Sequence, residues 1–224
     1  MTSSQAASRV RSVESAAIAG LAFAALSSAS RVLLNSPPEL TAPDSEIVDW
    51  YSDPGNRASL ILGLTLAVFA AVSFLWFIAV IRRRVGERED KFFATVFLGS
   101  GILIAGLMLV GSGSLASIAV TVDLLDGRVP DVDVLSAVTG LGRTLLVLVL
   151  VRVQAVFIVS ASTLALRTSA FSRWLSYLGY AIALWMFFMP LLIEPLRLGF
   201  PIWVAILSVA LLARRDDLIP DRHG

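Results

Sequence analysis

The sequence contains no cysteine, one histidine and one lysine, and each scarcity removes a class of chemistry. Without cysteine there is no disulfide, no iron–sulfur ligation and no cysteine-bound zinc. The histidine, His223, lies next to the C-terminus, which excludes a bis-histidine haem and a histidine metal centre. The lysine, Lys91, lies in a charged segment, which excludes a retinal-type Schiff base inside an apolar run. We therefore expect no cofactor.

Charge is also scarce. Only 16% of the residues are charged and 57% are hydrophobic, whereas ordinary soluble domains have about 25% and about 45–50%. The net charge of +1 gives no reason to expect nucleic acid as a partner. The apolar residues fall in long runs between short charged segments, the pattern of a polytopic membrane protein. We predict an all-α membrane helix bundle that forms one domain, residues 1–224, in a cell membrane of the bacterial inner-membrane type.

Six runs are candidates to cross the hydrocarbon core, which takes about 20 apolar residues. They are roughly 14–34, 58–81, 92–122, 134–166, 174–193 and 198–213. The third and fourth are longer than a crossing requires, so they must tilt, kink or project beyond the bilayer. The sixth is short.

The basic residues predict the orientation. With the N-terminus inside, the inner segments hold 12 Lys and Arg residues and the outer segments 4; the other 2 of the 18 lie within a span. By the positive-inside rule both termini are then cytoplasmic. The beginning "RVRSVESAAIAGLAFAALSSAS" also has features of a secretory signal peptide. Because the apolar run continues through "RVLL" and removal would leave five spans, we expect the segment to be retained.

Small residues predict where helices pack closely, because association in lipid depends on backbones approaching each other. The first run has a small residue at every fourth position from Ala16 to Ser28. The third run contains five glycines: Gly99, Gly101, Gly106, Gly111 and Gly113. We interpret both runs as packing faces.

The fourth run, "GRTLLVLVLVRVQAVFIVSAS" over residues 142–162, contains two arginines and no carboxylate. Each arginine costs about 2.5–3.5 kcal/mol at the centre of a membrane. Arg143 and Gln154 are eleven residues apart, about three α-helical turns, so we expect them to share an inward face. Arg152 is nine residues from Arg143, about 2.5 turns, and points the other way, toward another helix, another subunit or the headgroups.

No predicted span has an acidic residue at its centre, so partners must come from helix ends. Glu194 and Arg197 follow Pro190 in a short turn between the fifth and sixth runs, and Arg31 lies near the outer end of the first. Three interpretations stay open: an outward-facing pocket for an anionic group, a structural network between helices, and contact with lipid headgroups. The predicted polar cluster consists of Arg143, Gln154, Arg152, Glu194, Arg197 and Arg31.

Catalytic patterns are missing from the sequence. There is no serine–histidine pairing, and no paired carboxylates occur at helical spacing within a span. One outer segment supplies four carboxylates, Asp123, Asp126, Asp131 and Asp133, without the ordered spacing of a calcium loop. We predict neither an enzyme nor a metal site.

The segment "WYSDPGNRASLILGLTLAVFAAVSFLWFIAVIRRRVGERE", from Trp50 to Glu89, resembles a family of uncharacterised actinobacterial membrane proteins. Its features are an acidic short helix, a "DPGNR" turn, a span ending in "FLWF" and an arginine-rich connector. The resemblance covers about a fifth of the chain and implies a six-span integral membrane protein with no catalytic residues.

We expect a structural, regulatory or accessory membrane component that contacts the bilayer, including anionic lipids, and forms a homo-oligomer or part of a larger complex. The alternative is a small transporter or channel with an anion-attracting cleft near Arg143.

Overall fold

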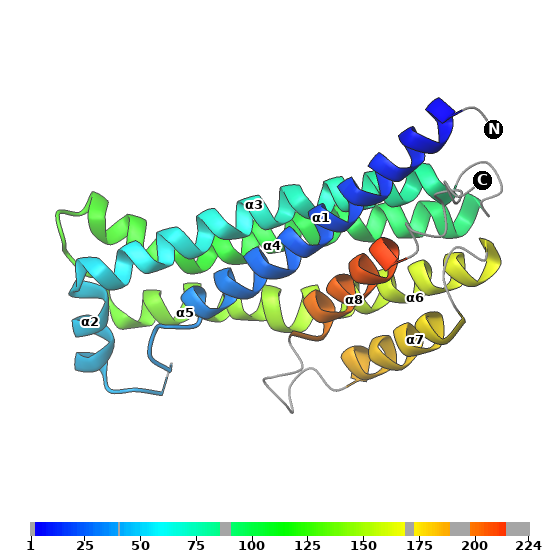
Figure 1. Cartoon of the computed structure of the whole chain (residues 1–224). Coiled ribbons are helices and arrows are strands. Elements are labelled where there is room, and N and C mark those ends of the chain that lie inside the picture. The colour runs from blue at the N-terminus through cyan, green and yellow to red at the C-terminus, as the bar shows by residue number, and fades with distance from the viewer. Residues whose placement is uncertain (1–2, 40, 86–90, 169–172, 189–197, 214–224) are drawn as a thin grey trace.

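A computed structural model describes residues 3–39, 41–85, 91–168, 173–188 and 198–213, and these ranges contain helices and turns but no strand (Figure 1). The helices are α1 (Ser3–Leu34), α2 (Asp44–Ser52), α3 (Pro54–Val85), α4 (Lys91–Leu124), α5 (Val132–Arg143), the π-helix η2 (Thr144–Val149), α6 (Leu150–Thr168), α7 (Arg173–Phe188) and α8 (Gly199–Ala213). The predicted all-α fold class is confirmed for the described residues.

Four segments are long and apolar enough to cross a membrane. They are Glu14–Leu34, Pro54–Arg82, Phe92–Leu124 and Val132–Arg167, close to the first four predicted spans. Between 33% and 39% of the most apolar part of each is buried in the bundle, so most of this apolar surface faces outward. An outward apolar surface on helices of this length suits hydrocarbon and not water. The described part of the chain therefore contains four candidate membrane-spanning helices.

The long helices run side by side (Figure 1). Helix α3 packs between α1 and α4, and α6 packs between α4 and α7, while α8 packs on α1. The short helices α7 and α8 lie beside the half of the bundle where α1 begins, and neither reaches the end that carries α2 (Figure 1). At 16 and 15 residues they measure about 24 and 22 Å along their axes. We call the two ends of the bundle the α1-start end and the α2 end.

Aromatic rings fill the middle of the bundle. Phe74 of α3 contacts rings from three other helices, Phe23, Phe157 and Phe200, with centroids 4.8–5.5 Å apart. All four side chains are at most 1% exposed. Such pairs add about 0.5–1.5 kcal/mol beyond the burial of their area. The rings fix α8 against α1, α3 and α6 at the point where α8 begins.

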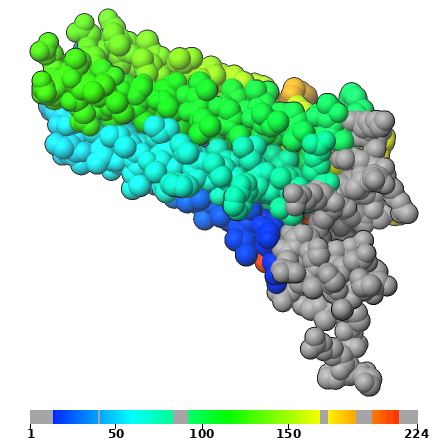
Figure 2. Space-filling view, turned by 90° about the horizontal axis from the view of Figure 1, so that it is seen from above, coloured from blue at the N-terminus to red at the C-terminus, as the bar shows by residue number. Residues whose placement is uncertain are grey.

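The glycines of α4 divide into two groups. A Cβ atom at Gly101 or Gly111 would lie 2.3 or 2.6 Å from a side chain of α3 or η2, so both glycines allow close packing. A Cβ at Gly99, Gly106 or Gly113 would meet nothing within 4 Å. Figure 2 shows α3 and α4 side by side along one long face of the molecule. Of the five glycines predicted to form a packing face, only Gly101 and Gly111 therefore pack closely against another described helix of this chain.

The predicted short acidic helix before the second span is α2, and the predicted Asp-Pro-Gly turn follows it. Asp53 accepts hydrogen bonds from the backbone N–H groups of Gly55 (2.6 Å) and Asn56 (3.3 Å). These bonds satisfy donors that the first turn of α3 leaves free, and Pro54 occupies the first helical position, where no N–H is needed. The turn fixes the direction in which α3 leaves α2.

The fourth predicted span is not a single α-helix, because α5 and α6 are separated by η2, whose i→i+5 bonds make wider turns. One bond of this register joins the Leu150 N–H to the Leu145 carbonyl. The wider turns rotate α6 by roughly a quarter turn from the phase of an uninterrupted α-helix. The α-helical spacing of 3.6 residues per turn therefore does not predict which residues of α5 and α6 share a face.

Candidate functional site

A cavity lies beside the start of α8, where the short α7–α8 pair leaves its longer neighbours uncovered. It is lined by residues of α1, α4, η2, α6 and the first turn of α8, and by Asn35, which follows α1. The volume open to water-sized probes is about 50 Å³, which holds a few water molecules at about 10–15 Å³ each. Six polar side chains line it: Ser27, Ser30, Arg31, Asn35, Ser112 and Gln154. We call this site the polar cavity.

Gln154 is the most deeply buried polar side chain of this cavity. It is 2% exposed, and its Oε1 atom has no hydrogen-bond partner among the described residues. Leaving such an acceptor unpaired costs about 1–3 kcal/mol. Because the amide belongs to the cavity wall, a molecule inside the cavity can supply the missing donor.

The α1 wall supplies the positive charge. The half-buried Arg31 lies one turn from Ser27, and both line the cavity. The Ser30 hydroxyl, 3% exposed, donates a 2.7 Å hydrogen bond to the Gly63 carbonyl of α3. This bond between helices holds the last turns of α1 against α3. The cavity wall therefore includes one arginine, from α1, and one buried amide, from α6.

The structure brings Arg31 and Gln154 to one cavity, but Arg143 is not among the residues that line it. The reason is η2, which supplies Leu146 and Val147 to the cavity wall and changes the phase between Arg143 and Gln154. That Arg143 and Gln154 share one face stays a prediction. π-Helical turns occur frequently at functional sites.

Arg143 instead affects the pKa of Tyr51 in α2 through its charge. The Tyr51 side chain is 3% exposed. Burial raises the pKa of its hydroxyl above the ordinary value, while a hydrogen bond with Thr139 and the charge of Arg143 act in the opposite direction. The half-buried Arg143 forms no hydrogen bond or ion pair to another residue within the described ranges. Arg143 thus belongs to the contact between α2 and α5.

Arg152 is half-buried and donates a 2.7 Å hydrogen bond to the Leu148 carbonyl, one turn earlier. The acceptor belongs to η2, the element directly before α6, and no bond from Arg152 to any other element is found among the described residues. It is not among the residues of the polar cavity. The other two predicted members of the cluster, Glu194 and Arg197, lie outside the described residues.

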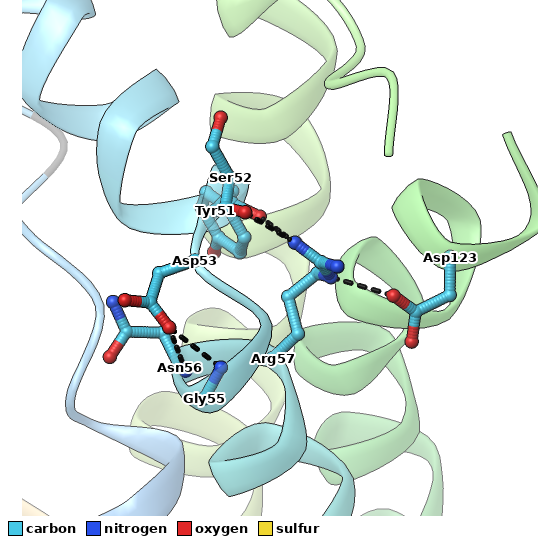
Figure 3. A network of polar contacts seen from close by, with 7 residues as sticks. All are labelled: Tyr51, Ser52, Asp53, Gly55, Asn56, Arg57 and Asp123. Atoms are coloured by element: carbon cyan, nitrogen blue, oxygen red, sulfur yellow. Dashed lines mark hydrogen bonds and ion pairs between the residues drawn. The ribbon is translucent and has the colours of Figure 1, made fainter. Parts of the chain in front are cut away.

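A polar network at the α2 end was not predicted from the sequence (Figure 3). Arg57 is 8% exposed and donates to the carbonyls of Tyr51 (2.9 Å) and Ser52 (2.8 Å) and to the Asp123 carboxylate (2.7 Å). One guanidinium thus joins the last turn of α2 to α3 and to the last turn of α4. The sequence signal for this network is limited to the position of Arg57 directly before the second predicted span. In the positive-inside comparison, Arg57 is simply one of the four basic residues of the outer segments.

No group of three or more possible metal ligands comes together in the described part of the chain. Asp123, one of the four acids considered for a metal, pairs with Arg57 instead.

Searches of family models, curated proteins and solved structures find no match to this chain.

Proposed function

We propose that this chain is a six-span cell-membrane protein that binds a small anionic group in the polar cavity and carries out no catalysis itself. Helices α7 and α8 serve as the fifth and sixth spans, and both termini are cytoplasmic. Two observations support this topology: α8 runs toward the end where α1 begins (Figure 1), and the basic residues divide 12 to 4 between the two sides. The polar cavity then lies in the outer half of the membrane.

The observation that carries the binding role is that Gln154, whose buried Oε1 has no partner among the described residues, lines the same cavity as Arg31. A guanidinium attracts an anion and recognises its oxygens through several N–H donors. The amide oxygen selects a ligand that also carries a hydrogen-bond donor. A phosphate group with a neighbouring hydroxyl meets both requirements. The volume admits such a group but not a large substrate.

Binding tests this proposal with two probes, because the anionic group comes either from a lipid headgroup or from solution. The purified chain is placed in phosphatidylcholine nanodiscs, and affinity is measured for added phosphatidylglycerol and for inorganic phosphate. Arg31→Gln is expected to weaken binding of the true ligand about tenfold, the effect of losing one charge-assisted hydrogen bond of about 1.4 kcal/mol. The control is Arg128→Gln, because Arg128 is exposed outside the cavity.

Equal binding by wild type and Arg31→Gln would contradict the proposal, as would binding of neither probe. Uptake of phosphate by proteoliposomes separates a transporter from a binding protein. Transport that is abolished by Arg31→Gln and unchanged by Arg143→Leu is the result expected of a transporter, since only Arg31 lines the cavity.

A second candidate function is that of an accessory or self-associating component. The observation that favours it is an open face of α4, on which glycines recur every seven residues at Gly99, Gly106 and Gly113. A Cβ atom placed on any of them would meet nothing within 4 Å in the described structure. Glycines at such spacing let a second helix approach closely in lipid. Gly106→Leu is then expected to shift the protein purified from native membranes from a complex to a single chain. A wild-type protein that is already monomeric and unaccompanied would contradict this candidate.

A further inference from the structure

A second cavity lies in the half of the bundle at the α1-start end, between α3, α4, α6, α7 and α8. Its walls are mainly apolar, including the rings of Phe77, Phe97, Phe157 and Trp203. None of the residues that line it carries a charge. We call this site the apolar cavity. It is separate from the polar cavity and shares no residue with it.

Three buried polar atoms meet at this cavity without a partner in the described structure: Ser162 Oγ of α6, Ser176 Oγ of α7 and Trp203 Nε1 of α8. Each of these side chains is 2% exposed. They are three of the four buried side-chain atoms of this kind found among the described residues. Leaving each unpaired is costly, so three in one place indicate an occupant.

Gly179 of α7 shows how close these groups are. A Cβ atom on Gly179 would lie 2.2 Å from Ser162 Oγ and 3.2 Å from Trp203 Nε1. The hydroxyl and the indole N–H therefore flank the same point of the α7 backbone. Ser176 lies one turn before Gly179 on α7. The absence of a side chain at Gly179 is what lets the three helices meet here.

The serine hydroxyls on either side of the cavity depart from the usual behaviour of hydroxyls in apolar helices, which bond to the carbonyl four residues earlier. On α6, Ser160 and Thr163 both do so, at 2.9 and 2.8 Å. Ser162, between them, does not. Ser162 lines the cavity, and its hydroxyl lies beside Gly179 of α7.

The three groups define the chemistry of the occupant. An indole N–H can only donate, and both hydroxyls can donate, so the shared partner is an acceptor oxygen. The volume open to water-sized probes is about 20 Å³, enough for one or two atoms of that size. No charged residue lines the cavity, so an anion would be buried without a counter-charge, which is unfavourable. The volume therefore suits a neutral oxygen, and a hydrocarbon body attached to that oxygen would lie outside the cavity.

We propose that the apolar cavity binds the carbonyl oxygen of a neutral lipid, with Trp203, Ser162 and Ser176 as the donors and the apolar body of the lipid outside the cavity, in the hydrocarbon around the helices. Ester carbonyls of a diacylglycerol and ring carbonyls of a quinone share this chemistry. The experiment separates these two sources.

The test measures the thermal unfolding of the full chain in detergent with three probes. They are dioleoylglycerol, a short-chain benzoquinone, and a dialkylglycerol in which ether oxygens replace the ester carbonyls. A ligand that binds only the folded state raises the unfolding temperature. At least one of the two carbonyl probes is expected to raise it, and the ether lipid is expected to raise it less than dioleoylglycerol.

Trp203→Phe keeps an aromatic ring and removes the N–H, so it is expected to weaken binding of the effective probe about tenfold. Combining it with Ser162→Ala should abolish the shift. The matched controls are Ser160→Ala, whose hydroxyl bonds to its own helix, and Trp185→Phe, whose ring is 43% exposed. Both controls should retain the wild-type shift.

Two results would overturn the proposal: no shift with either carbonyl probe, which leaves ordered water as the occupant, or an equal shift in Trp203→Phe. If Trp203→Phe does not fold, Ser162→Ala and Ser176→Ala answer the same question separately.

Discussion

Replacing Arg57 by alanine is expected to lower the free energy of unfolding by about 3 kcal/mol, because it leaves buried partners of a charged group unpaired. The guanidinium is 8% exposed and makes three hydrogen bonds of 2.7–2.9 Å. Two of them satisfy carbonyls at the C-terminal end of α2, where a helix leaves carbonyls without partners of its own. The third joins α3 to α4 through Asp123. Thermal or denaturant unfolding of the purified chain in one detergent measures the change.

Two companion variants identify the source of this effect. Arg57→Lys retains the charge without the planar set of donors, so it should recover only part of the loss. Asp123→Asn should cost less than about 1 kcal/mol, because the Asp123 side chain is 47% exposed and water can replace its partner. An Asp123→Asn effect as large as that of Arg57→Ala would show that the ion pair, and not the bonds to α2, stabilises this end.

Gly142→Ala and Gly106→Ala are expected to change stability in opposite directions. A Cβ at Gly142 would lie 2.7 Å from a Leu115 methyl group and 3.1 Å from the Gly111 carbonyl oxygen of α4. Because a backbone atom is involved, the helices must move apart. We expect a loss of about 2 kcal/mol, within the range of overpacking.

A Cβ at Gly106 meets nothing within 4 Å, so alanine there gains only helix propensity, about 0.5–1 kcal/mol. Denaturant unfolding of the isolated chain measures both variants against wild type. The close α4–α5 packing would be refuted if Gly142→Ala were as stable as Gly106→Ala.

Hydropathy was enough to place the four long spans, since crossing hydrocarbon requires about 20 consecutive apolar residues. The candidate segment Glu14–Leu34 coincides with the first prediction, and each end of the other three lies within four residues of the predicted end. The acidic helix α2 and its turn were also predictable, because proline and glycine fix local backbone geometry.

The arrangement inside the bundle could not be predicted in the same way. The sequence of η2, "TLLVLV", contains no proline or glycine, so nothing local signals the change of hydrogen-bond register. Gln154 lines the polar cavity, whereas Arg143 acts on the pKa of Tyr51, and the π-helix lies between them in the sequence. The Arg57–Asp123 pair joins residues 66 positions apart, and the three donors of the apolar cavity come from three helices. Such contacts depend on how helices pack and not on any single run of residues.

The central claim is that the polar cavity is an anion-attracting site open to the outer side of the membrane. Because the chain has no cysteine, Ser27→Cys provides a single thiol on the cavity wall. Intact cells are treated from outside with small, membrane-impermeant thiosulfonates, one anionic and one cationic. We expect the Ser27→Cys thiol to be modified from outside. The ratio of anionic to cationic modification should be higher for this thiol than for a Ser52→Cys thiol at the exposed reference position. Adding Arg31→Gln should remove this difference. Modification only in opened cells, or no preference for the anionic reagent, would contradict it.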